Sequence, residues 1–211
     1  MTSAIKQSSI EHFLDELASR KATPGGGSAA AVIGAMAAAL LSMVCNLTIG
    51  KAKYRDVERE LNAVLARTEE LRGQLTEMIE KDVESFGAVI TAYAMPRQTQ
   101  EELALRAQAI QTALKKATQV PLRCCRVCCE IIDLSAVVAQ KGNTNVLSDA
   151  GVAVLAAHAA VRSGALNVMI NVKAITDRQF VTHQVAELDK LLSRASAATE
   201  ACYRSVKKSI G

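Results

Sequence analysis

At 211 residues, the chain is long enough to bury a hydrophobic core as one domain or at most two small ones. Half of its residues are apolar, only 3% are aromatic and none is Trp, so alanine, leucine and valine must fill the interior. Small aliphatic side chains suit closely packed helices better than a β-sandwich, and three prolines leave few tight turns. The composition predicts an all-α protein.

The net charge of +4 is small and argues against nucleic-acid binding. Basic and acidic residues are interleaved in segments such as VERELNAVLARTEELRGQL (residues 57–75), which is typical of a solvated helix face. A small anionic ligand fits the mild excess of positive charge better. Six cysteines without an apolar secretory signal at the N-terminus indicate free thiols in a reducing cytoplasm.

Hydrophobic periodicity predicts a single-domain bundle of about six to seven helices. In chain order the helices are expected over residues 3–19, 28–49, 56–95, 98–140, 149–163 and 177–209, with GALNVMINV (164–172) as a further segment. Ser28 is expected to cap the second helix, and Pro121 is expected to kink the fourth.

The run ATPGGGSAAAVIGAMAAALLSMVCNLTIGK (residues 22–51) contains no charged residue before its final lysine. Its alanines make it weakly hydrophobic, and it has no aromatic belt, so a membrane span is not expected. Small uncharged side chains predict instead a central Ala/Gly-rich helix buried among other helices. A phosphate-binding P-loop is excluded because CNLTIGKA (residues 45–52) lacks both the first glycine and the final hydroxyl.

Gly25, Gly26 and Gly27 lie just before the predicted start of this helix. Bare backbone N–H groups and the positive end of the helix dipole favour an anion or a polar ring edge there. A flexible connector whose glycines allow close packing explains the same residues equally well. The residues alone leave both interpretations open.

Metal binding is suggested only by RCCRVCCE (residues 123–130), in which Cys125 and Cys128 form a CxxC spacing. No second pair of ligands follows at zinc-site spacing, and the three histidines are isolated along the chain. Cysteines at helical spacing behave as small apolar residues. The sequence therefore predicts packing at this segment and no metal site.

The segment KGNTNVLSDAG (residues 141–151) crowds four polar residues between apolar segments: Asn143, Asn145, Ser148 and Asp149. One such residue is enough to cap the next helix, so four of them indicate a polar site. Asn167 and Asn171, four residues apart, extend this polarity along a helix face. Asp82 lies within the third predicted helix, where a single aspartate usually faces solvent.

Together these motifs resemble the cyclodeaminase/cyclohydrolase family, which comprises the cyclodeaminase half of formiminotransferase-cyclodeaminase and the stand-alone bacterial methenyltetrahydrofolate cyclohydrolases. Four blocks carry the resemblance, in order: FLDELASRKATPGGGSAAA, MVCNLTIGKAKY, DVESFGAVITAYAMP and GNTNVLSDAGVAVLAAHAAVRSGALNVMINV. They extend over roughly residues 13 to 172. The whole chain, residues 1–211, is interpreted as a single domain of this type.

The resemblance implies an all-α domain that forms a homodimer or larger homo-oligomer and binds a tetrahydrofolate derivative in a helical cleft. It implies neither a metal nor a redox cofactor, and no nucleic-acid or membrane partner. Gly50-Lys51, and the expected absence of a formiminotransferase part, look more like the stand-alone cyclohydrolases. The expected reaction is the hydrolysis of 5,10-methenyltetrahydrofolate to 10-formyltetrahydrofolate.

The chemistry of this substrate suggests roles for the matching residues. Its methenyl bridge is an amidinium cation, so a positioned water and a carboxylate base suffice. Asp149 and Asp82 are both candidate bases, and Lys51 is a candidate for steering the water, donating to the departing nitrogen or holding the folate carboxylates. The residues expected to bind the substrate are Gly25, Gly26, Gly27, Ser28, Asn46, Thr48, Asn143, Asn145, Ser148 and Asn171.

Two alternatives stay open at this point. A formiminotetrahydrofolate cyclodeaminase would have the same fold and would release ammonia from the formimino compound. A non-catalytic helical protein would use its alanine-rich faces to oligomerise, or would bind folate without turning it over. The consumed substrate separates the first alternative from the cyclohydrolase, and folate binding without turnover identifies the second.

Overall fold

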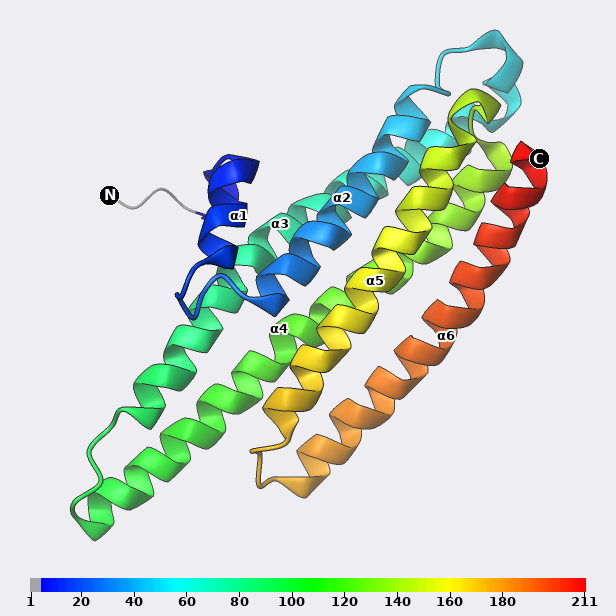
Figure 1. The fold of residues 1–211 in the computed structure, drawn as a ribbon. Coiled ribbons are helices and arrows are strands. Elements are labelled where there is room, and N and C mark those ends of the chain that lie inside the picture. The colour runs from blue at the N-terminus through cyan, green and yellow to red at the C-terminus, as the bar shows by residue number, and fades with distance from the viewer. Residues whose placement is uncertain (1–4) are drawn as a thin grey trace.

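The computed structural model describes residues 5–211 as a bundle of helices (Figure 1). The predicted all-α fold is confirmed, and no strand occurs within the described residues. The first two residues of the helix predicted over 3–19 lie outside them. The elements are η1 (Ile5–Gln7), α1 (Ile10–Ala18), α2 (Gly26–Asn46), η2 (Ala52–Val57), α3 (Glu58–Tyr93), α4 (Gln100–Lys141), η3 (Thr144–Val146), α5 (Leu147–Val172) and α6 (Arg178–Ile210).

Helix α2 is central, as predicted, and packs against α3, α4 and α5. Its small residues allow this closeness: a β-carbon at Gly34 would lie 2.7 Å from the Cys128 sulfur of α4. One side of α2 is nevertheless uncovered, because Met36 and Met43 are exposed. The expectation of a helix surrounded on all sides is therefore wrong along this stripe.

The start of α2 differs from the prediction. Its N-cap is Gly25, in an extended conformation, and Ser28 lies inside the first turn with a fully buried side chain. Ser28 is therefore not a helix cap. The helix begins two residues earlier than predicted, and Gly27 in its first turn leaves room for the Asp82 side chain of α3.

The predicted separation of residues 149–163 from 164–172 is also wrong, because α5 continues through both. A glycine inside a helix costs only about 1 kcal/mol. Close packing compensates for this at Gly164, where a β-carbon would lie 2.8 Å from the Cys125 sulfur. Helix α4 runs through Pro121 as the single predicted helix, and the kink expected there stays a prediction.

All six cysteines are buried free thiols, which confirms the packing interpretation of the cysteine-rich segment. Burial disfavours the thiolate and raises the pKa of Cys125 and Cys129, while a hydrogen bond with Cys124, together with burial, raises the pKa of Cys128. Among residues 5–211, no three His, Cys, Asp or Glu side chains gather as metal ligands.

Two helical stretches, Gly26–Asn46 and Thr144–Val172, are long and apolar enough to cross a membrane by length and composition alone. In the most apolar 18-residue part of each stretch, 56% and 44% respectively is buried inside the bundle. Helices at the centre of a globular bundle pass the same test, because they too lack charges. The two stretches are therefore no evidence of a membrane span.

Candidate active site

A cavity of about 250 Å³ lies at the beginning of α2. Helices α3, α4 and α5 and the loop before α2 complete its wall. The lining residues are Ala22, Thr23, Gly25, Gly26, Gly27, Asp82, Ser85, Phe86, Val89, Ala117, Asn167, Ile170 and Asn171. Asp82 is the one charged residue among them, so the cavity surrounds a carboxylate with neutral groups.

Asp82 does not face open solvent as a lone helical aspartate usually does. It is half-buried, and its Oδ2 atom accepts a hydrogen bond of 2.9 Å from the Ser28 hydroxyl. Burial raises the pKa of Asp82 above its ordinary value, and hydrogen bonds from the Ser28 side chain and backbone offset part of that rise. A carboxylate with a raised pKa accepts a proton more readily than an ordinary aspartate does.

The glycines provide the rim of this cavity, as expected. The first N–H groups of a helix have no intrahelical acceptor, and at α2 the first such bond is Ala29 N–H to the Gly25 carbonyl. The Gly26 and Gly27 backbones therefore present donors at the positive end of the α2 dipole. The tight contact of Gly27 with Asp82 fits close packing as well, so a ligand at these glycines stays a prediction.

Asn167 and Asn171 extend from α5 into the same cavity. The Asn167 amide donates to the Ser163 carbonyl at 2.9 Å, and the Asn171 amide donates to the Ala117 carbonyl at 3.1 Å. These bonds fix both side chains, whose amide oxygens can accept hydrogen bonds from a ligand. Asn167 was not among the predicted site residues, although its four-residue spacing from Asn171 was the signal that marked it.

The other end of α2 carries a second polar cluster. Thr48 is fully buried, donates to the Val44 carbonyl at 2.6 Å and accepts from the Asn143 N–H at 2.8 Å. The Asn143 side chain donates to the Leu47 carbonyl and accepts from the Asn145 N–H. Thr48 and Asn143 thus connect the end of α2 to the loop before α5, and their contact with substrate stays a prediction.

Tyr54 strengthens this connection, a role that no sequence pattern predicted. Its hydroxyl accepts from the Thr144 N–H at 3.1 Å, and hydrogen bonds from the Thr144 backbone and side chain lower the Tyr54 pKa to about 8. The predicted residues that stay accessible around the cluster are Asn46, Lys51, Asn145 and Ser148, which are exposed, and Asp149, which is half-buried.

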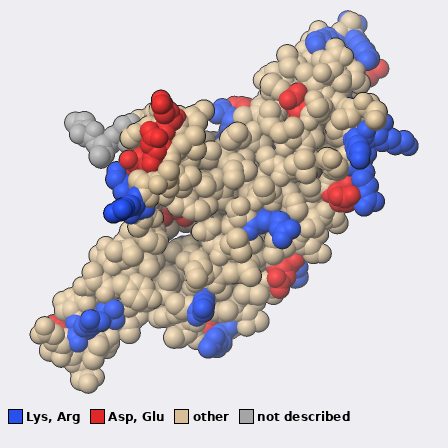
Figure 2. Space-filling model, viewed as in Figure 1, with Lys and Arg blue, Asp and Glu red and all other residues tan. Residues whose placement is uncertain are grey.

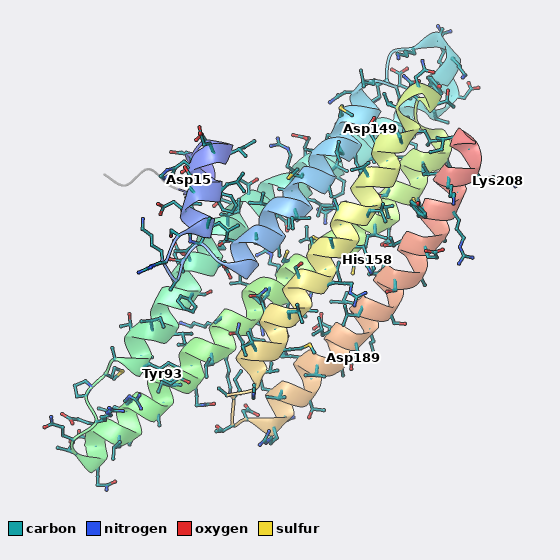
Figure 3. The ribbon with its side chains drawn as sticks, viewed as in Figure 1. Asp15, Tyr93, Asp149, His158, Asp189 and Lys208 are labelled. Carbon is teal, nitrogen blue, oxygen red and sulfur yellow. The ribbon has the colours of Figure 1, made fainter. Side chains whose placement is uncertain are left out.

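The two clusters lie at opposite ends of α2. A helix of 21 residues is about 30 Å long, so Lys51 cannot reach the cavity that holds Asp82 in the same chain. Figure 3 places Asp149 at the start of α5, beside the end of α2 and far from the tip of α3, where Tyr93 lies. The expected single pocket formed by both ends of α2 is therefore wrong for one copy of the chain.

An exposed apolar surface connects the two clusters. It is formed by Met36, Met43 and Leu47 of α2 with Val152, Leu155, Leu166, Met169 and Ile170 of α5, and we call it the α2/α5 face. Figure 2 shows few charged side chains where these helices lie in Figure 1. Between Asp149 and Lys173, the only Lys, Arg, Asp or Glu of α5 is Arg162.

Comparison with known proteins assigns this fold and site to a class. The sequence profile described as Formiminotransferase-cyclodeaminase matches residues 9–190. A formiminotetrahydrofolate cyclodeaminase from Thermotoga maritima has the same fold, with a TM-score of 0.83 and 36% identity over 98% of this chain and 97% of that one. The chain belongs to the formiminotransferase-cyclodeaminase family.

Two relatives indicate more narrowly which members of this family the chain resembles. A methenyltetrahydrofolate cyclohydrolase from Methylorubrum extorquens is 59% identical over 95% of this chain and 97% of its own length. The formimidoyltransferase-cyclodeaminase of Rattus norvegicus is 32% identical over 91% of this chain, which spans only 36% of that longer protein. The resemblance to the family that the motifs carried is confirmed.

Proposed function

We propose that the protein is a methenyltetrahydrofolate cyclohydrolase, which hydrolyses 5,10-methenyltetrahydrofolate to 10-formyltetrahydrofolate in one-carbon metabolism. The 59% identity to a protein of that name, over nearly the full length of both chains, supports this activity. The observation that carries it in the structure is the half-buried Asp82, held by Ser28 inside a neutral cavity.

Asp82 is the general base in this proposal. The bridge carbon of the substrate is already electrophilic, so the enzyme has to deliver a water deprotonated by a nearby carboxylate. A negative carboxylate in a neutral cavity also attracts the amidinium cation. Asp149, the other candidate base, is half-buried at the opposite end of α5 and does not line this cavity.

The cavity supplies complementary groups for the pterin ring. The Gly26 and Gly27 N–H groups are donors for ring carbonyl or nitrogen atoms, and the amide oxygens of Asn167 and Asn171 are acceptors for ring amino groups. Phe86, which is 38% exposed at the edge, offers an apolar surface for a ring. The folate substrate and water are the only reactants in this proposal, which assigns no role to a metal or redox cofactor.

In the proposed homodimer, the second polar cluster of one copy lies beside the Asp82 cavity of the other copy. A twofold axis that lies in the α2/α5 face and runs across both helices turns the second copy end for end. Lys51 and Asp149 of that copy then approach the cavity that holds Asp82. The exposed apolar side chains support this arrangement, because large exposed apolar patches on a protein often mark an interface.

Within this dimer, Lys51 from the second copy holds the folate carboxylates or donates to the departing ring nitrogen. Asn46, Asn145 and Ser148 border the same end and donate hydrogen bonds to the substrate, while Asp149 orients the Lys51 ammonium. Residues 1–211 act as one domain. The free thiols fit a cytoplasmic enzyme.

Formiminotetrahydrofolate cyclodeaminase is the second candidate, since the Thermotoga maritima protein of that title has the same fold at 36% identity. The higher identity to the cyclohydrolase favours the first. A non-catalytic folate-binding or oligomerising protein fits less well, because it has no need for a carboxylate held inside a neutral cavity.

Purified protein, treated with chelator, should accelerate the loss of the methenyltetrahydrofolate chromophore above buffer hydrolysis. Ammonia release from formiminotetrahydrofolate is measured in parallel. Turnover of the formimino compound alone identifies the cyclodeaminase, and folate binding without either turnover identifies the non-catalytic alternative.

A further inference from the structure

The Ser28 hydroxyl lies between two acceptors on α3. Its Oγ atom is 2.9 Å from Asp82 Oδ2 and 3.2 Å from the Ile79 carbonyl oxygen. A hydroxyl carries one proton and two lone pairs, so it donates to only one of these oxygens at a time and can accept from another group. Which bond forms depends on the protonation of Asp82.

When Asp82 is ionised, Ser28 donates to its carboxylate, which has no proton to give. When Asp82 is protonated, its own O–H donates to Ser28, and the Ser28 proton turns to the Ile79 carbonyl. Every hydroxyl proton then has an acceptor in both states. A buried serine with only one acceptor would lose a hydrogen bond in one of them, which is costly in an enclosed site.

We propose that Ser28 is a positioning residue that supports Asp82 in both protonation states by reversing the direction of their hydrogen bond. The proposal rests on the proposed function, in which Asp82 gains and returns a proton during each turnover. Ser28 itself is fully buried and does not touch the substrate. This replaces its expected role as a substrate contact.

The surroundings leave Ser28 as the main partner of Asp82. The cavity residues that face Asp82 from the other elements are uncharged: the glycines and the loop before α2, Asn167 and Asn171 of α5, and Ala117 of α4. No neighbouring charge in the cavity wall therefore compensates for a change in protonation. Gly27 leaves room for the carboxyl group beside Ser28, because a β-carbon at this position would lie 2.1 Å from Asp82 Oδ1.

The two states correspond to the two halves of the reaction. The Asp82 carboxylate first takes one proton from the attacking water, whose oxygen bonds to the methenyl carbon. Protonated Asp82 then gives that proton to N5 as the carbon–N5 bond breaks. The hydroxyl proton of the adduct leaves to solvent as the formyl C=O forms, so one water is consumed and one proton is released.

Ser28→Ala and Ser28→Cys test the proposal by kinetics, the second keeping the side-chain volume with a poor hydrogen-bonding group. We expect kcat to fall at least about tenfold, the effect of losing one charge-assisted hydrogen bond, with KM within about twofold of wild type. Ser42→Ala is the matched control: Ser42 is also buried on α2, but its hydroxyl bonds Thr68 at 3.0 Å, away from the cavity. A raised KM with unchanged kcat would overturn the proposal.

Infrared spectroscopy of the protein without substrate tests the reversal itself. The carboxyl bands of protonated Asp82 are isolated by subtracting the spectrum of Asp82→Asn at the same acid pH. In Ser28→Ala these bands should shift toward those of an acid that donates no hydrogen bond. Identical bands in wild type and Ser28→Ala would mean that Ser28 hydrogen-bonds Asp82 only when Asp82 is ionised, and the inference is then wrong. Because this measurement needs no turnover, it is separate from the test of the cyclohydrolase activity.

Discussion

Gly27 and Asp82 are in direct contact between α2 and α3: a β-carbon on Gly27 would lie 2.1 Å from Asp82 Oδ1. Because Gly27 has no side chain, the Asp82 carboxylate can lie at this place between the two helices. The glycine run does two things, since Gly26 and Gly27 present backbone donors and Gly27 leaves room for the proposed base.

Gly27→Ala should fold and lose most of its activity. The Asp82 side chain can swing away from the added methyl group, so the cost is in the position of the carboxylate, and a misplacement of about 1 Å can lower kcat about 10²-fold. The measurement is kcat with a thermal melt. Gly73→Ala is the control: nothing lies within 4 Å of its β-carbon position on α3, so it should keep full activity and gain up to about 1 kcal/mol in stability. Full activity of Gly27→Ala would remove Asp82 from its proposed role.

Asp82→Asn should lower kcat by about 10² to 10⁴, the usual contribution of a general base. Asp189→Asn on the exposed surface of α6 is the matched control and should leave kcat unchanged. Asp149→Asn should lower kcat less than Asp82→Asn, because Asp149 only orients Lys51 in the proposed dimer. The reverse ranking of the two variants would make Asp149 the base.

The pH dependence should follow the raised pKa of Asp82. A base works only when ionised, so kcat/KM should fall as pH drops through a value above the ordinary aspartate pKa of about 4. The folded state binds this proton more tightly than the unfolded state. Asp82 therefore lowers stability as pH rises between the two pKa values. Asp82→Asn should melt at a higher temperature than wild type at neutral pH and not at acid pH; an acid limb at an ordinary aspartate pKa contradicts the assignment.

Subunit complementation tests the site shared between two copies. Asp82→Asn and Lys51→Ala homodimers should each be nearly inactive. A purified heterodimer of the two, made by co-expression with different affinity tags, contains one intact site out of two. It should therefore recover about half of the wild-type activity. A heterodimer no more active than its parents would mean that both residues act within one copy.

Met36→Glu places a charge in the middle of the α2/α5 face and should convert the dimer to monomers with loss of activity. A buried unpaired carboxylate opposes association strongly. Ile210→Glu is the control, since Ile210 is similarly exposed at the end of α6 and outside that face. Sedimentation or light scattering gives the mass. A wild-type protein that is monomeric and fully active would exclude the proposed dimer.

Much of the fold was predictable because local signals agree with the tertiary arrangement. The breaks at Pro96 and at KGNTNVLSDAG, and the periodicity of the segments that became α3, α4 and α6, predicted those helices to within a few residues. The errors occurred at Ser28 and Gly164. There, close helix–helix contact decided the backbone against the usual preferences for a serine cap and a glycine break.

The site was predictable only in part. The sequence singled out Asp82, the glycines and Asn171, which the structure brings to one cavity. It could not show that Thr48 and Asn143 are buried and already hydrogen-bonded to each other. It also grouped Lys51 with Asp82, because a set of family motifs does not show how far apart the residues lie in the folded chain.

The sequence by itself determined the helical class, the uncharged central helix, the family and the residue types available for catalysis, since these depend on composition, periodicity and motif. Only the tertiary structure decided which of these residues lie next to one another. The length of α2 separates its two polar ends, while the packing of α2 against α3 brings Ser28 and Gly27 to Asp82. Burial and hydrogen bonding at that contact are properties of neighbours far apart in the chain, and they are the reason why we propose Asp82 as the base.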